Sequence, residues 1–78
     1  MKIQESAENY LETILVLHKR KGILRSIDIA NDMDFSKPSV SVAMKNLRLG
    51  GYIKVDDDGN ITLLDKGLEI AEKIYERH

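Results

Sequence analysis

Apolar side chains recur every three or four residues in the first part of the chain, which is the spacing of a helix with one buried face. The pattern predicts a first helix from Ser6, as its N-cap, to about Lys19, with Gly22 as the stop. A short extended link follows, and Ser26 is predicted to cap a brief second helix with the sequence IDIANDM.

A third helix is predicted over residues 36–49. Ser36 begins it, Pro38 is tolerated in its first turn, and the pair Gly50 and Gly51 supplies the left-handed stop. The runs YIKV and ITLL flank the acidic turn DDDGN and predict a β-hairpin. A last helix is predicted over residues 65–78 with Asp65 as its cap. The order α-α-α-β-β-α defines a mainly α fold with a small β-hairpin.

This order is that of a winged helix-turn-helix, in which the second helix of a close pair enters the major groove of DNA. Rotation by about 100° per residue places Val40, Met44 and Leu47 on one face of the third helix. The opposite face carries a different set: Pro38, Val42, Lys45, Asn46 and Leu49, with Ser39 and Ser41 on its flanks. No carboxylate occurs in residues 36–55, so this face suits a groove lined by phosphates.

The predicted DNA-binding residues combine small, hydroxylated and basic side chains. The serines are suited to hydrogen bonds with phosphates or base edges, and the lysines and the arginine supply charge. The set is Ser36, Lys37, Pro38, Ser39, Ser41, Val42, Lys45, Arg48 and Lys54. Val42 has two interpretations, contact with a thymine methyl or an ordinary surface hydrophobe, and we favour the first. Leu49 is assigned to packing under the hairpin or against a partner.

The hairpin is a weaker candidate for DNA contact. Its tip, residues 56–58, is three aspartates, which DNA would repel. Lys54 precedes the tip and is the one wing residue that we place near a phosphate, whereas Asn60 is suited to a neutral contact. A hairpin that merely closes the core explains the pattern at least as well.

Length and composition restrict the remaining choices. Seventy-eight residues with 42% hydrophobic content predict a single domain over residues 1–78. No apolar stretch is long enough to span a membrane, there is no cysteine, and no nucleophile elbow or phosphate-binding loop is present. We therefore predict a cytoplasmic protein that is not an enzyme and has no membrane partner.

Charge is uneven along the chain. The net charge is -1, yet residues 13–55 hold eight basic and three acidic side chains, and the rest holds four basic and ten acidic ones. A basic middle is expected where one face meets phosphate, although charge alone is equally compatible with a solvated surface. A winged-helix module that binds protein and not DNA remains the alternative function, since the wing is acidic and Val42 and Leu49 are predicted to be exposed.

Four segments, ENYLETI, IDIANDM, FSKPSVSVAMKNLRLGGYI and ITLLDKGLEIAEKIYERH, resemble the N-terminal domain of the DtxR/MntR family of metal-dependent repressors. The resemblance implies sequence-specific binding of double-stranded DNA by a homodimer. It also implies that Fe(II) or Mn(II) raises the DNA affinity of the longer protein. The last two residues, 77 and 78, carry no helix-stop signal. We therefore expect a truncated chain whose last helix begins a linker to a dimerisation domain.

The same resemblance places metal ligands at Asn9, Glu12 and His78. Asn9 departs from the Met or Asp of family members, and the family's other ligands lie beyond residue 78. A cation that takes about six ligands finds at most three here. We therefore favour a solvated acidic helix face with a frayed terminal His, and no metal bound by this chain alone. His18 matches no ligand and is interpreted as a surface or helix-end cation.

Overall fold

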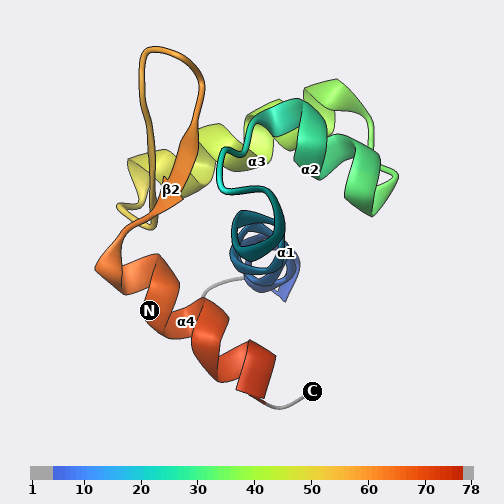
Figure 1. Ribbon diagram of the computed structural model, residues 1–78. Coiled ribbons are helices and arrows are strands. Elements are labelled where there is room, and N and C mark those ends of the chain that lie inside the picture. The colour runs from blue at the N-terminus through green and yellow to red at the C-terminus, as the bar shows by residue number, and fades with distance from the viewer. Residues whose placement is uncertain (1–4, 77–78) are drawn as a thin grey trace.

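The computed structural model describes residues 5–76, and the predicted order of four helices and two strands is confirmed within them (Figure 1). The elements are α1 (Glu5–Lys21), α2 (Ser26–Met33), α3 (Lys37–Leu49), β1 (Ile53–Val55), β2 (Ile61–Leu63) and α4 (Asp65–Glu76). Helix α1 runs through the middle of the fold, with α2 and α3 on one side and α4 on the other. The two strands form a hairpin that extends beside α3.

The core forms around α1 because this helix contacts every other layer. Its side chains Leu11 and Ile14 are fully buried, and so are Ile29 of α2, Val40 of α3 and Ile61 of β2. No polar or charged side chain is buried in the described part of the chain. Packing of apolar side chains therefore stabilises the fold, with no internal ion pair or polar network.

The predicted helix starts are wrong at three places, because the residue expected to cap each helix already lies within it. Ser6 lies inside α1, which is already helical at Glu5. Ser26 is the first residue of α2, and its N-cap is Arg25. Asp65 lies inside α4, since the amide of Leu68 donates to the carbonyl of Leu64 at 2.8 Å.

The turn between α2 and α3 is closed by one strained residue and one cap. Asp34 has φ 57° and ψ 41°, a left-handed conformation that carboxamide and carboxylate residues tolerate better than most. The amide of Phe35 donates to the carbonyl of Ala30 at 3.1 Å, which ends α2. Ser36 is confirmed as the N-cap of α3 because its Oγ accepts the amide hydrogen of Ser39 at 3.4 Å.

The hairpin is antiparallel, with Ile53 opposite Leu63 and Val55 opposite Ile61. It is attached to the link before α2 by two hydrogen bonds to the same residue. The amide of Ile61 donates to the carbonyl of Leu24 at 2.7 Å, and the amide of Leu24 donates to the Oδ1 atom of Asn60 at 3.0 Å. The wing and the start of the helix-turn-helix are thereby held at a fixed distance.

Candidate nucleic-acid interface

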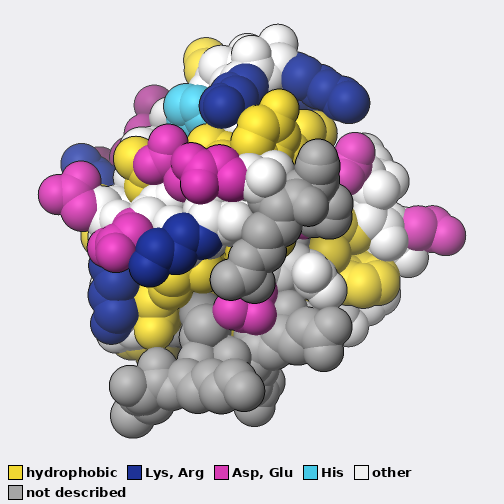
Figure 2. Space-filling model, turned by 90° about the horizontal axis from the view of Figure 1, so that it is seen from below, with side chains coloured by type: hydrophobic (Ala, Val, Ile, Leu, Met, Phe, Trp, Pro, Cys, Tyr) yellow, Lys and Arg dark blue, Asp and Glu magenta, His cyan; other side chains and the backbone are white. Residues whose placement is uncertain are grey.

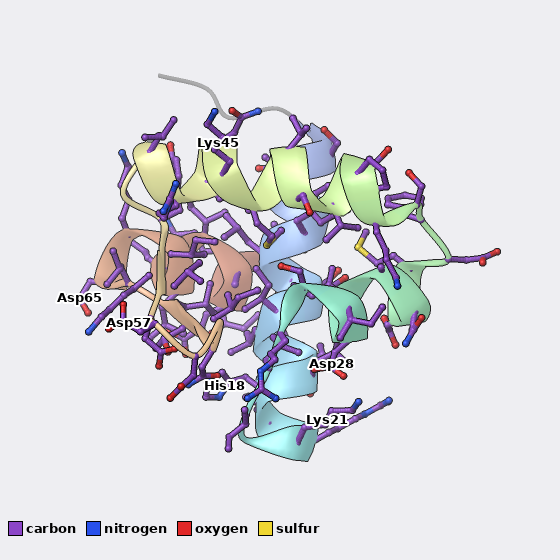
Figure 3. The ribbon with its side chains drawn as sticks, turned by 90° about the horizontal axis from the view of Figure 1, so that it is seen from above. His18, Lys21, Asp28, Lys45, Asp57 and Asp65 are labelled. Carbon is purple, nitrogen blue, oxygen red and sulfur yellow. The ribbon has the colours of Figure 1, made fainter. Side chains whose placement is uncertain are left out.

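Helix α3 has the two faces that its rotation predicts. Val40, Met44 and Leu47 are buried against the core. The opposite face is exposed at every predicted position: Pro38, Val42, Lys45, Asn46 and Leu49. Figure 3 shows Lys45 on the outer side of α3, directed away from the other helices. A helix that presents one complete face to solvent at the edge of the fold has the placement required for insertion into a groove.

The two flanks of this exposed face differ in charge. Rotation by about 100° per residue places Lys37, Lys45 and Arg48 on one flank together with Ser41. This basic flank borders a shallow groove against α2, which is lined by Ser26, Ile27, Lys37 and Ser41. The other flank carries Ser39 and Asn46 and no charge. Cations are thus concentrated on one flank of α3, and Lys37 among them lines the groove against α2.

The serines at the start of α3 differ in whether their hydroxyl hydrogens are already used in hydrogen bonds within the helix. The hydroxyl of Ser36 donates to the Oγ atom of Ser39 at 2.9 Å, in addition to its role as helix cap. Ser36 therefore contributes mainly to the structure of the helix start. Ser39 retains its own hydroxyl hydrogen for an external acceptor, and Ser41 is exposed on the basic flank.

Leu49 does not pack under the hairpin, and that half of its prediction is wrong. Its side chain is 72% exposed, the largest value among the described apolar residues, and Val42 on the same face is 59% exposed. The reason is geometric: Leu49 lies nine residues from the buried Val40, which is half a turn out of phase with the core. Only an external partner would cover it.

The wing, which is the β1–β2 hairpin, carries one predicted cation and makes two side-chain hydrogen bonds to the link before α2 that the sequence did not predict. Lys54 is exposed on β1, opposite Thr62. Asn60, which the sequence suggested as a neutral DNA contact, accepts the amide hydrogen of Leu24 with its side-chain oxygen. Arg25 had no assigned role, and its Nε atom donates to the carbonyl of Asp58 at the wing tip at 3.1 Å. Both contacts join residues more than 30 positions apart, so no local sequence signal marks them.

An ion pair fixes the start of α2 at the end of the molecule away from Lys45. The Nζ atom of Lys21 lies 3.0 Å from the Oδ1 atom of Asp28, and Figure 3 shows the two residues at one end of the molecule. The Oδ2 atom of Asp28 accepts the amide hydrogen of Arg25 at 2.9 Å. These two hydrogen bonds, that from the Arg25 backbone first, hold the pKa of the Asp28 carboxyl below its ordinary value.

One group of acidic side chains lies on α4, on the other side of α1 from α3. Helix α4 carries Asp65, Glu69, Glu72 and Glu76 along one shallow groove, together with Lys73. Seen from the side of α4, acidic and basic side chains lie among apolar ones (Figure 2). The exposed face of α3 has no such mixture, since residues 36–55 contain no carboxylate. The exposed face of α3 is thus free of acidic residues, whereas α4 carries four of them.

The predicted metal ligands do not form a site within the described residues. Asn9 is exposed on α1 and Glu12 is half-buried one turn later, whereas His78 lies outside residues 5–76. No group of three or more His, Asp or Glu side chains that could hold an ion occurs in the part of the chain that the structure describes. An amide and one carboxylate are too few donors for Fe(II) or Mn(II), so the described residues do not fit this ion by themselves.

Taken together, a tight α2–α3 pair, an exposed acid-free α3 and a tethered wing define a winged helix-turn-helix DNA-binding domain. Residues 2–61 match the family of the iron dependent repressor, N-terminal DNA binding domain. The chain belongs to this family, as the sequence resemblance implied. Members of this family are transcriptional regulators and not enzymes, which confirms the prediction that the chain is not an enzyme.

Relatives of known class agree with this assignment. The chain is 30% identical over 77 residues to an HTH-type transcriptional regulator of Methanocaldococcus jannaschii and covers 62% of it. It is 30% identical over 73 residues to the HTH-type transcriptional regulator MntR of Lysinibacillus sphaericus and covers 52% of it. These alignments include 97% and 94% of the present chain. The chain therefore spans between half and two thirds of the length of these relatives.

Solved structures confirm the winged-helix fold. MepR, a transcription regulator of the Staphylococcus aureus multidrug efflux pump MepA, superposes with a TM-score of 0.74 at 26% identity over 97% of this chain and 58% of MepR. The structure of the S. aureus MepR–DNA complex gives a TM-score of 0.76 at 25% identity, over 96% of this chain and 59% of that one. Among residues 5–76, no helix is long and apolar enough to cross a membrane.

Proposed function

We propose that this chain binds operator DNA by placing α3 in the major groove, as the DNA-binding head of a metal-dependent repressor. The observation that carries the proposal is the exposed face of α3, which combines Val42 with Lys45 in a stretch that has no carboxylate. A carboxylate on such a face would meet the phosphates on both sides of the groove. Its absence is explained by that environment and by no feature of the core.

Each predicted residue has a role in this proposal. Lys37, Lys45, Arg48 and, on the wing, Lys54 neutralise phosphates, because their ammonium and guanidinium groups are exposed on the DNA side. Ser39 and Ser41 donate hydroxyl hydrogens to phosphates or base edges. Pro38 and Val42 give apolar contacts, that of Val42 being with the C5-methyl group of a thymine. Ser36 holds the start of the helix.

Regulation belongs to the longer protein in this proposal. The relatives are longer than this chain, and we assign dimerisation and the remaining ligands of an Fe or Mn ion to segments that it does not share. Helix α4 begins the connection to those segments. Asn9, Glu12 and His78 would then supply only part of the ion's ligands. Such a repressor acts in the cytoplasm as a homodimer on two half-sites.

The test is the titration of labelled duplexes with the wild-type chain and with Val42→Asp. A carboxylate at the centre of the face should abolish binding, since its charge would be desolvated beside phosphates. Wild-type affinity, measured by fluorescence anisotropy, should fall by at least about tenfold between about 50 and 200 mM salt. Tyr75→Asp places the same charge on an exposed position of α4 and should bind as the wild type does. Equal affinity of Val42→Asp and Tyr75→Asp would refute the assigned face.

A further inference from the structure

Asn46 is an exposed side chain on α3 that the proposed phosphate and methyl contacts do not use. It lies one turn after Val42, displaced by about 40° around the helix axis, on the uncharged flank of the face. Its main-chain oxygen accepts the amide hydrogen of Gly50 at 3.0 Å, which fixes the backbone at the end of the helix. Its side-chain amide makes no hydrogen bond to any residue in the described range 5–76.

A free amide on a groove-facing helix has a specific chemistry. The Asn side chain presents one acceptor and two donor hydrogens in a single plane. In the major groove, adenine offers an acceptor, N7, beside a donor, N6, and these match the amide in a bidentate pair. Guanine offers two acceptors there, and thymine offers one acceptor beside a methyl group. Adenine is therefore the base that satisfies both hydrogen-bonding groups of Asn46.

We propose that Asn46 is a specificity-determining residue that selects an adenine in the operator, close to the base pair whose thymine methyl group contacts Val42. This inference rests on the proposed placement of α3 in the major groove. The rise from Val42 to Asn46 is about 6 Å along the helix, and successive base pairs are about 3.4 Å apart. The selected adenine thus lies within about two base pairs of that thymine.

Neighbouring side chains are less suited to this role. Lys45 carries a long, flexible ammonium whose donors are satisfied by any phosphate or acceptor. The Oγ atom of Ser39 already accepts a hydrogen bond from Ser36. Leu49 follows Asn46 on the face but has no polar group. Asn46 is the residue of the exposed face whose donors and acceptor are paired in one rigid plane.

The experiment is a selection from a pool of duplexes with a randomised centre, by the wild-type chain and by Asn46→Ala. The wild type should enrich an adenine at one position by about tenfold, within the range for a bidentate base contact. Asn46→Ala should lose that preference, keep the others, and bind unselected duplex within about twofold of the wild type. Asn31→Ala removes an exposed amide from α2 and should leave the selected sequence unchanged.

A substitution in the DNA tests the same contact at the level of atoms. Replacing the selected adenine by 7-deazaadenine removes the N7 acceptor, so it should weaken the wild type about fivefold and leave Asn46→Ala unaffected. An unchanged adenine preference in Asn46→Ala, or equal losses for both proteins, would overturn the role of Asn46. Absence of any duplex binding by the wild type would instead show that the proposed function itself fails, and with it this inference.

Discussion

Gly67 of α4 packs directly against the backbone carbonyl of Tyr52, at the entrance to β1. The same carbonyl oxygen accepts the amide hydrogen of Leu64 at 3.0 Å. Helix α4 therefore crosses the start of the hairpin at a distance that leaves no room for a side chain. Lys66 strengthens the crossing, because its Nζ atom lies 3.2 Å from the carbonyl oxygen of Gly50 and 4.3 Å from the centre of the Tyr52 ring.

Substitution of Gly67 by alanine should destabilise the domain severely. The new Cβ atom would overlap the Tyr52 carbonyl oxygen and lie 3.0 Å from its carbon, and a backbone cannot move aside as a side chain can. We expect a loss of about 3 kcal/mol in the free energy of unfolding, measured by urea denaturation. Gly22→Ala is the control, since that position has open space and a left-handed φ of 80° and should lose only about 1 kcal/mol. Equal losses would contradict the close crossing.

Asn60→Ala should weaken the attachment of the wing to the link before α2. The substitution leaves the amide of Leu24, a fully buried residue, without its acceptor, and such a loss costs about 1 to 2 kcal/mol. Asn60→Asp keeps an oxygen at the same place and should lose clearly less. Urea denaturation compares the variants, and faster hydrogen exchange at the amides of Leu24 and Ile61 should accompany Asn60→Ala alone. Identical stabilities for the Ala and Asp variants would argue against this tether.

Asp28→Asn should lower stability by about 0.5 to 1 kcal/mol near neutral pH, since it removes the charge that Lys21 and the Arg25 amide stabilise. The pKa of Asp28 in the folded state lies below its ordinary value of 3.8. Near and below pH 3.8, the unfolded state therefore binds more protons than the folded state. This contribution is complete above the ordinary pKa and is lost as the pH falls through the lowered one. The stability difference between wild type and variant should therefore vanish in acid. A difference that persists at the lowest pH would exclude this cause.

Lys45→Gln should reduce the dependence of DNA affinity on salt. Each phosphate that a lysine neutralises contributes about one unit to the slope of log K against log salt concentration. The slope should fall by about one while the sequence preference stays the same. Lys73→Gln is the matched control, because Lys73 lies on α4 beside Glu69, at 3.5 Å. A reduced slope for Lys73→Gln as well would assign the effect to net charge.

The sequence alone predicted the elements and the faces of α3, because both follow from local periodicity. The side chain of Val40 is 0% exposed and that of Val42 is 59% exposed although they are two residues apart, as a helical rotation requires. The start of α3 at Ser36 and its stop near Gly51 were also predictable, since a hydroxyl cap and a left-handed glycine act within one turn.

What the sequence did not predict depends on partners distant in the chain. The contacts from Arg25 to Asp58 and from Leu24 to Asn60 form only after the wing has folded back on the link. The start of α2 shows the same limit at shorter range: Ser26 is a good capping residue, yet Asp28 accepts the amide hydrogen of Arg25 and moves the boundary. That Leu49 does not pack under the hairpin likewise required knowledge of where the hairpin lies.

The acidic wing tip gives the domain a preferred orientation before it touches DNA. Asp56, Asp57 and Asp58 follow directly after the acid-free stretch, and the tethers to Leu24 and Arg25 hold them at a fixed place beside α3. A duplex that approaches the tip is repelled, whereas one that approaches the basic flank of α3 is attracted. We therefore expect the aspartates to affect the rate of association with DNA more than the rate of dissociation.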